Sequence, residues 1–236
     1  MSTHALFDGH AQKYDSWFMD NVNVFQSELN LLKISLGNIG KLNILSMGCG
    51  SGLFEQALKE QYDIRVTQGV EPSEDMANIA QQRGLSVTIT SAEDFEYAKD
   101  TYDIIYFNGS SSYIQDLTRV YKRAYDGLKA GGKLILLDVP KDSQYGSVYL
   151  LAKALGTYDH EMLDGVKPPK PYPLELVNNG IWHTSQEKID ILTQLGMTDI
   201  QSYQTLMNHP VYSNETLEPV IEGHKQGGYV AIIATK

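Results

Sequence analysis

Residues 43–55 have the sequence NILSMGCGSGLFE, in which a short apolar run ends at three alternating glycines and a second apolar, helix-forming run follows. The pattern predicts a strand, a tight turn and the start of a helix. Glycine has no Cβ, so it adopts a positive φ without strain and lets the backbone approach a ligand closely. The free N–H groups and the dipole of a helix N-terminus favour negatively charged groups. The stretch therefore predicts a nucleotide-type cofactor site near residue 50.

Two established nucleotide-binding patterns differ from this turn. The dinucleotide fingerprint G-x-G-x-x-G needs a third glycine, where this chain has Leu53. The phosphate-binding loop G-x-x-x-x-G-K-[ST] needs a lysine, and none follows Gly52. The chain has G-x-G-x-G instead. This spacing alone also fits an ordinary strand-to-helix turn that binds no ligand, so the choice depends on residues further along the chain.

A carboxylate follows the next expected strand. Residues 64–70, IRVTQGV, predict a second strand, and Glu71 comes directly after it. An acid about 20 residues past the glycines is well placed to accept two hydrogen bonds from a ribose diol. Ser73 is expected to cap the following helix, with acids at positions 74 and 75 in its first turn. The alternative, a solvated loop acid, is less compatible with the buried strand expected immediately before Glu71.

Five segments of the chain occur in the order found in one enzyme family. They are LSMGCGSG (45–52), GVEPS followed by Met76 (69–73), SAEDF (91–95), YDIIYFN (102–108) and LKAGGKLIL (128–136). In these segments the chain resembles the class I S-adenosylmethionine-dependent methyltransferases, small-molecule type. Residues 7–15 are also similar to the lid helix of many small-molecule members of that family.

The resemblance implies S-adenosylmethionine as the cofactor. Glu71 would hold the ribose hydroxyls, and residues 92–94 would read the adenine edge. Asn108 and Gly109 would line the methionine end. The complete set of implied cofactor-binding residues is Tyr14, Gly48, Cys49, Gly50, Ser51, Glu71, Pro72, Met76, Ala92, Glu93, Asp94, Asn108, Gly109 and Tyr113.

The residue types agree with this cofactor. It carries no phosphate, so it needs no lysine or arginine at the glycine turn, and none is there. Its sulfonium group is positive, so the neighbouring acids Glu71, Glu93 and Asp94 are electrostatically tolerable. Asp94 is also a suitable acceptor for the exocyclic amino group of adenine.

The expected fold class is α/β, because strand and helix patterns alternate along the chain. The resemblance implies a seven-stranded Rossmann-like sheet, mostly parallel, with helices on both faces and an antiparallel last strand between the fifth and sixth. Strands are expected near 42–47, 64–70, 85–90, 102–107, 133–139, 197–206 and 228–236. Helices are expected over 10–36, 52–61, 73–83, 113–127 and 185–195.

We expect one methyltransferase domain over residues 1–236, with N-terminal lid helices in 1–36 and a substrate-cap insertion at about 140–184. The insertion is longer than a normal connection. It contains Tyr145, Tyr149, Tyr158, a proline-rich run and Trp182. Its aromatic content favours a cap, and the alternative is a solvated loop with a short helix at 145–156.

The implied reaction is direct displacement at the methyl carbon, which needs a general base only if the acceptor is protonated. The catalytic residue stays unknown at this point. Weak candidates for a base are His183, Tyr172 and His160, followed by His209 and Asp138. His183 has an alternative role, because it directly precedes the expected helix cap at Thr184.

The acceptor is not assigned by the motif after the fourth strand. Residues 108–113, NGSSSY, lack both the Asn/Asp-Pro-Pro-Tyr/Phe motif and a His-His pair. By position, Ser112 or Tyr113 would face the acceptor. The expected function is therefore methyl transfer to an O, N or C atom of a small molecule. A non-catalytic S-adenosylmethionine-binding partner or regulatory protein is the alternative, and other chemistry on the same fold, such as aminopropyl transfer, is a third.

Composition limits the partners. The chain has 29 acidic and 19 basic residues among 236, a net charge of −10, and no basic track for a nucleic-acid backbone. No run approaches ~18 apolar residues, and the N-terminus lacks the pattern of a signal peptide. The single cysteine, Cys49, excludes an intrachain disulfide. We expect a cytoplasmic monomer or homodimer with no metal, nucleic-acid or membrane partner.

Overall fold

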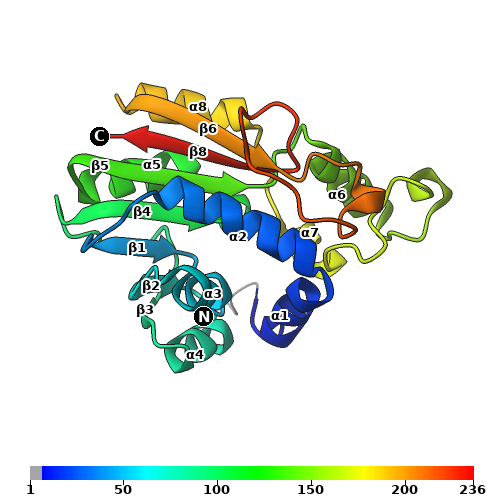
Figure 1. Cartoon of the computed structure of the whole chain (residues 1–236), viewed down its shortest axis with the longest axis horizontal. Coiled ribbons are helices and arrows are strands. Elements are labelled where there is room, and N and C mark those ends of the chain that lie inside the picture. The colour runs from blue at the N-terminus through cyan, green and yellow to red at the C-terminus, as the bar shows by residue number, and fades with distance from the viewer. Residues whose placement is uncertain (1–6) are drawn as a thin grey trace.

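A computed structural model describes residues 7–236, so residues 1–6 of the expected lid region lie outside the described part. A central sheet lies between two groups of helices (Figure 1). The strands are β1 (Ile44–Met47), β2 (Gln68–Glu71), β3 (Ser86–Ile89), β4 (Tyr102–Asn108), β5 (Leu128–Asp138), β6 (Thr198–Thr205), β7 (Ile221–Glu222) and β8 (Tyr229–Thr235). The helices are α1 (Ala11–Asp20), α2 (Val22–Leu36), α3 (Leu53–Tyr62), α4 (Glu74–Gln82), α5 (Leu117–Gly127), α6 (Gln144–Leu155), α7 (Leu174–Asn179) and α8 (Ser185–Gln194).

The strand order confirms the expected α/β fold class. The order is β3-β2-β1-β4-β5-β8-β6-β7, and the pairs from β3 through β5 are parallel. The last strand, β8, lies between β5 and β6 and is antiparallel to both, as predicted. The sheet has eight strands instead of seven, because the two-residue β7 pairs with β6 at its edge. Two exposed residues carry too short a pattern to predict a strand.

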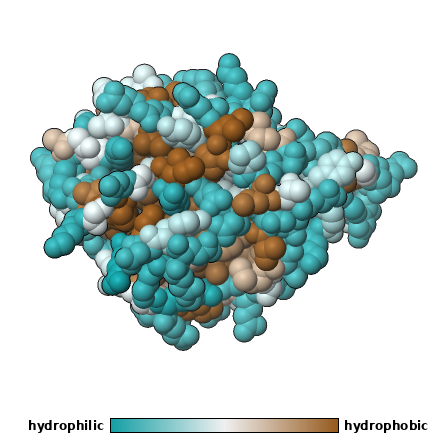
Figure 2. Space-filling view, in the orientation of Figure 1, coloured by the Kyte–Doolittle hydropathy of each residue, from teal (hydrophilic) through white to brown (hydrophobic). Residues whose placement is uncertain are grey.

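Both faces of the sheet are covered, because hydrophobic side chains alternate along its central strands. In β4, Ile104 and Tyr106 pack with α2 and α3 on one face. Ile105 and Phe107 pack with α5 and α8 on the other. This alternation is the period of two expected for a strand. Figure 2 shows the face on which α2 lies, where a group of hydrophobic residues interrupts a largely hydrophilic surface.

Several boundaries differ from those predicted. The second strand begins at Gln68 and not at residue 64, because Ile64 N–H instead donates to Leu58 O and closes the end of α3. The fifth strand begins at Leu128 and not at residue 133, directly after α5. The expected helix over 113–127 begins at Leu117, where Asp116 caps it by accepting a hydrogen bond from Arg119 N–H.

The expected helical region 10–36 is divided into two helices. α1 ends before Asn21, whose N–H donates to Phe18 O and whose side-chain amide donates to Trp17 O. α2 then begins at Val22 with a new direction (Figure 1).

The segment 140–184 contains α6, a short 3-10 helix (Glu161–Leu163) and α7, a helix that the sequence did not predict. Figure 1 shows α6 and α7 at the end of the sheet where β5 terminates, with α1 close to α7. In open α/β sheets, the carboxyl ends of the strands are where ligands bind. This placement puts the segment beside the glycine turn that follows β1.

Candidate active site

A cavity of about 820 Å³ lies at the carboxyl ends of β1, β2 and β4. Ligand-binding cavities commonly have volumes of roughly 300–1,000 Å³. Its lining includes most of the residues predicted to hold the cofactor, namely Tyr14, Gly48, Gly50, Glu71, Pro72, Met76, Ala92, Glu93, Asp94, Asn108, Gly109 and Tyr113. Tyr172, one of the weak catalytic candidates, also lines it.

The glycine turn needs its first glycine for two reasons. Gly48 has a φ of +70°, and a Cβ at this position would lie 2.5 Å from Ser110 Cβ. The N–H groups of Gly48 and Cys49 donate to Val70 O at 2.8 and 3.0 Å, so the turn is fixed to the end of β2. Ser110 was not predicted, although it lines the cavity and its hydroxyl donates to Met47 O. The turn therefore keeps backbone atoms at the cavity wall.

Glu71 is held between the glycine turn and the start of α4. Its carboxyl oxygens accept hydrogen bonds from Gly50 N–H and Ser73 N–H, both at 2.9 Å. Burial raises the pKa of Glu71 to about 7, although these two hydrogen bonds oppose the shift. As predicted, Ser73 caps α4 by accepting a hydrogen bond from Met76 N–H. The carboxyl group is thus oriented at the cavity wall before any ligand arrives.

The loop after β3 forms another wall of the cavity. The Ser91 hydroxyl donates to the Asp94 carboxylate at 2.9 Å, and Asp94 N–H donates back to Ser91 Oγ at 3.1 Å. A Glu93 carboxylate oxygen accepts a hydrogen bond from Gln115 N–H. Arg123 of α5 donates to the carbonyl oxygens of Glu93 and Phe95. An arginine outside the cavity therefore fixes the loop that carries two acidic side chains into it.

Two predicted cofactor residues, Cys49 and Ser51, are not in the cavity lining. Cys49 is buried against Gly69, where an added Cβ would lie 2.6 Å from its sulfur. Burial raises the pKa of the Cys49 thiol well above its ordinary value. The Ser51 hydroxyl donates to the Asp15 carboxylate at 2.5 Å, away from the cavity.

The N-terminal segment contributes Phe7 and Tyr14 to the cavity wall. The Phe7 and Tyr113 rings meet edge to face, with centroids 4.9 Å apart. Asp15 of α1 forms an ion pair with Arg83 at 2.7 Å, and Arg83 also donates to Ser51 O. α1 is thereby attached to the glycine turn and to the end of α4.

A smaller chamber of about 60 Å³ adjoins this cavity. The two share Tyr14, Asn108, Gly109, Tyr113 and Tyr172 in their linings. The rest of the chamber wall consists of Trp17, Phe18, Glu28, Phe54, Asp138, Val139, Tyr149, Trp182 and Tyr229. It is therefore mainly aromatic, with two carboxyl side chains.

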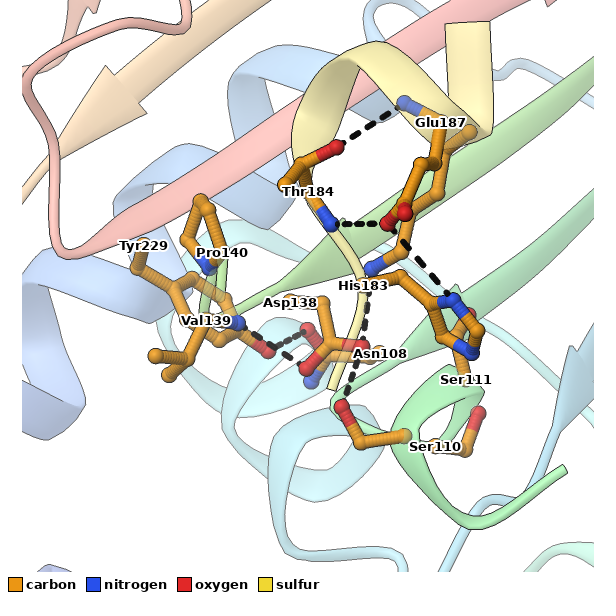
Figure 3. A network of polar contacts seen from close by, with 12 residues as sticks. Asn108, Ser110, Ser111, Asp138, Val139, Pro140, His183, Thr184, Glu187 and Tyr229 are labelled. Carbon is orange, nitrogen blue, oxygen red and sulfur yellow. Dashed lines mark hydrogen bonds and ion pairs between the residues drawn. The ribbon is translucent and has the colours of Figure 1, made fainter. Parts of the chain in front are cut away.

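Asp138, at the end of β5, is held by several donors. Its carboxylate accepts hydrogen bonds from the Ser112 hydroxyl and from Lys188 Nζ, both at 2.9 Å, and from Val139 N–H. Figure 3 shows Asp138 between Tyr229 and the turn that carries His183. The Tyr229 hydroxyl donates to Asn108 Oδ1 at 3.0 Å. The buried Asp138–Lys188 pair thus joins β5, α8 and the turn after β4.

Glu28 is a site residue that the sequence analysis missed. Its side chain lies in the chamber wall, 6% exposed, and burial followed by the nearby Asp138 raises its pKa well above the ordinary value. One signal was available, because Glu28 lies on the same apolar face of α2 as Phe25, Leu29 and Leu32. An acid at such a position is rarely buried without a reason.

The other catalytic candidates lie in different places. Asp138 lines the chamber, whereas His183, His160 and His209 line neither cavity. His160 and His209 each cap a short 3-10 helix through Nδ1. His183 lies 3.8 Å from Glu187, and burial followed by the positive charge of Lys188 lowers its pKa. Thr184 forms the expected helix cap, a reciprocal capping box with Glu187.

The described residues, 7–236, contain no helix that is both long enough and apolar enough to span a membrane.

The cavity fits the cofactor implied by the sequence. Three acidic side chains, Glu71, Glu93 and Asp94, lie in its wall, and no lysine or arginine is among the described residues that line it. Such a wall suits a ligand with a ribose, an adenine and a positive sulfur.

The chain is similar to several known proteins, two of which are described as methyltransferases. An uncharacterised protein of Methanocaldococcus jannaschii is 29% identical over 231 residues, which is 98% of each chain. The malonyl-[acyl-carrier protein] O-methyltransferase of Bacillus cereus is 27% identical over 132 residues, covering 55% of this chain and 49% of that protein. A crystal structure from Thermotoga maritima, described as a SAM-dependent methyltransferase and possible histamine N-methyltransferase, has a TM-score of 0.81 at 28% identity and covers 98% of both chains.

Residues 23–193 match the family model described as a methyltransferase domain. This match covers most of the sheet and both sides of the cavity. The chain therefore belongs to the methyltransferase domain family and is an S-adenosylmethionine-dependent methyltransferase.

Proposed function

We propose that the chain transfers the methyl group to an O, N or C nucleophile of a small molecule by direct displacement, inside the two connected cavities. The observation that carries the proposal is their junction at Tyr14, Asn108, Gly109, Tyr113 and Tyr172. The larger cavity contains the residues expected to bind the cofactor. The acceptor would then occupy the smaller, aromatic chamber.

The chain's residues have separate tasks in this proposal. When bound, S-adenosylmethionine supplies a methyl group activated by its positive sulfur. Glu71 would hold the ribose, and the Glu93–Asp94 loop would face the adenine. Tyr113 and Tyr172, which line both cavities, would orient the acceptor and exclude water. The segment 140–184 would act as the substrate cap, and α1 as the lid.

The relatives' names do not assign the acceptor. One names a malonyl-carrier O-methyltransferase and the other a possible histamine N-methyltransferase. The alternative of a non-catalytic binding partner is not favoured, because the family is one of methyltransferases. We also propose a cytoplasmic monomer or homodimer that does not bind nucleic acid, and the net charge of −10 supports the last point.

The first test compares cofactors by thermal unfolding. A ligand that binds only the folded state raises the melting temperature by mass action. We expect S-adenosylmethionine to raise it and NAD to have little effect, and Glu71→Ala to lose most of the rise. Equal rises in the wild type and in Glu71→Ala would contradict the role of Glu71. Formation of S-adenosylhomocysteine in the presence of a pool of small metabolites would then demonstrate methyl transfer. If no fraction of that pool led to S-adenosylhomocysteine, the non-catalytic alternative would be supported.

A further inference from the structure

The walls of the smaller chamber are built from aromatic rings contributed by separate segments. Trp17 and Tyr172 meet edge to face with centroids 5.0 Å apart. Tyr149 contacts both Tyr172, at 6.1 Å, and Trp182, at 5.3 Å. Aromatic rings attract cations through the negative potential of their faces. The chamber is therefore suited to a small group that is apolar or positively charged.

The described wall of the chamber carries acidic side chains and no basic ones. Its only charged lining residues within the described chain are Glu28 and Asp138. Asp138 is already compensated by Lys188, whose ammonium group lies 2.9 Å from it and is equally buried. No lysine, arginine or histidine lies in the described chamber wall to compensate Glu28.

The Glu28 carboxyl group also lacks a partner in the chain. Its side chain is 6% exposed, and none of the hydrogen bonds or ion pairs among residues 7–236 involves it. A buried carboxyl group without a partner is costly, because it loses its hydration and gains nothing in exchange. Its position in the chamber wall is explained if a ligand supplies the missing donor.

We propose that this chamber binds the ammonium group of a small primary or secondary amine, with Glu28 as its hydrogen-bond and charge partner and the aromatic rings around it. The inference rests on the proposed function, since it names the class of methyl acceptor for the same site. Ammonium groups offer several donors and no acceptor, which matches an acceptor-only carboxylate among rings. For methyl transfer, the ammonium group would give one proton to the Glu28 carboxylate. The freed lone pair of the nitrogen would then form the N–C bond as the S–C bond of the donor breaks, and S-adenosylhomocysteine would leave.

Binding of an ammonium group should release a proton. The ionisable groups near Glu28 are Asp138 of β5 and the hydroxyls of Tyr14, Tyr145, Tyr149 and Tyr229. Lys188 acts through Asp138. None of them donates to Glu28, so the empty chamber favours the protonated carboxyl group. A bound ammonium group favours the carboxylate instead, and the carboxyl proton then leaves to solvent.

The first experiment measures binding to the full chain by calorimetry, with and without saturating S-adenosylhomocysteine. Three amines, 2-phenylethylamine, n-butylamine and ethanolamine, are each compared with the alcohol that replaces the amino group by a hydroxyl. We expect at least one amine to bind roughly tenfold or more tightly than its alcohol. Titrations in two buffers of different ionisation enthalpy should show release of a proton with the amine. Equal affinities for all amine–alcohol pairs would overturn the proposal.

Variants locate the binding group. Glu28→Gln keeps the size of the side chain and is neutral, like the form that burial favours, so the fold should persist. It should abolish the preference for amines over alcohols and the proton release. The matched control is Glu218→Gln, because Glu218 is also a buried carboxyl residue beside α2 but lies outside both cavities. Circular dichroism would show whether the Glu28→Gln variant is folded. An unchanged amine preference in the folded variant would also overturn the proposal.

Failure of this inference is distinguishable from failure of the proposed function. If S-adenosylmethionine binds and is turned over with neutral or anionic acceptors only, methyl transfer stands and the amine proposal falls. If amines bind through Glu28 but no methyl transfer follows, the chamber is an amine site and the proposed function falls.

Discussion

At the scale of single residues, two opposing effects set the pKa of the Glu71 carboxyl group. Burial favours its protonated form, while the N–H groups of Gly50 and Ser73 favour the carboxylate. The balance places its pKa at about 7, so the group titrates near neutral pH. A ligand that donates hydrogen bonds to Glu71 and brings a positive charge nearby will favour the carboxylate. Cofactor binding and protonation of this side chain are therefore coupled.

The prediction from this coupling is a pH-dependent affinity. From pH 6 to 8 the dissociation constant for S-adenosylmethionine should fall several-fold in the wild type, because the carboxylate becomes populated through about pH 7. In the ligand-free protein the contribution of Glu71 to the free energy of unfolding should fall as the pH rises from about 4.5 to about 7, since the folded state holds this proton more tightly than the unfolded chain, whose glutamates titrate near 4.5. Calorimetry and urea unfolding at several pH values measure both.

Glu71→Gln should weaken the pH dependence of both quantities, because glutamine does not titrate and the contribution of Glu71 is lost. The control is Glu74→Gln, a neighbouring exposed glutamate in the first turn of α4, which should keep the wild-type profiles. Identical profiles in the wild type and in Glu71→Gln would show that another group titrates.

At the scale of the element, the position of α1 depends on a few contacts with the rest of the chain. The helix carries Tyr14 to the cavity and Trp17 to the chamber. Asp15 connects it to Ser51 of the glycine turn and to Arg83 beyond α4. Asp15 and Arg83 are each about one-fifth exposed, so solvent screens their attraction only in part. The sequence predicted helices over 10–36, but it could not identify this attachment.

Asp15→Asn is expected to weaken cofactor binding about fivefold, which corresponds to roughly 1 kcal/mol. The asparagine loses the charge that pairs with Arg83, so α1 should spend more time away from the cavity. Binding of S-adenosylmethionine by calorimetry measures the change. Lys13→Gln is the control on the same helix, because the Lys13–Glu175 pair is largely exposed and pairs of that kind contribute little. Equal losses in the two variants would mean that the Asp15 contact has no special part in binding.

At the scale of the whole molecule, the larger cavity is assembled from segments that are far apart in the sequence. Its wall is formed by the N-terminal segment, the turns after β1, β2, β3 and β4, and Tyr172 of the 140–184 segment. The Trp17 indole N–H donates to the carbonyl oxygens of Lys170 and Pro171, so α1 and that segment are joined directly. A ligand in the cavity would therefore contact the N-terminal segment, the turns at the strand ends and the 140–184 segment at the same time.

S-adenosylhomocysteine should therefore slow amide hydrogen exchange in several separate places. We expect protection in α1, in the glycine turn at 48–52 and in residues 170–176, because opening any of them would expose the ligand. Strand β6, between β8 and β7, lies outside the cavity wall and should exchange at the same rate with and without ligand. Protection confined to the glycine turn would contradict a closing role for α1 and the 140–184 segment.

The sequence alone determined the features that depend on neighbouring residues. The glycine turn, the acid after the second strand and the order of strands and helices are local patterns, fixed by backbone conformation, capping and hydrophobic period. They were sufficient for the fold class and for Glu71, whereas Asn108 and Tyr113 came from the family resemblance, and all three line one cavity. Patterns failed where local signals were weak, as in the two-residue β7 and in the short α7.

Only the tertiary structure decided what lies beside the cofactor cavity. Glu28, Asp138 and Trp182 belong to a helix, a strand end and a loop, and no local pattern relates one to another. Packing of α2 against the sheet buries Glu28, and the 140–184 segment contributes Tyr149, Tyr172 and Trp182 to the same chamber wall. The character of that chamber arises from contacts between distant segments, which is why the glycine turn identifies the methyl donor and cannot identify the acceptor.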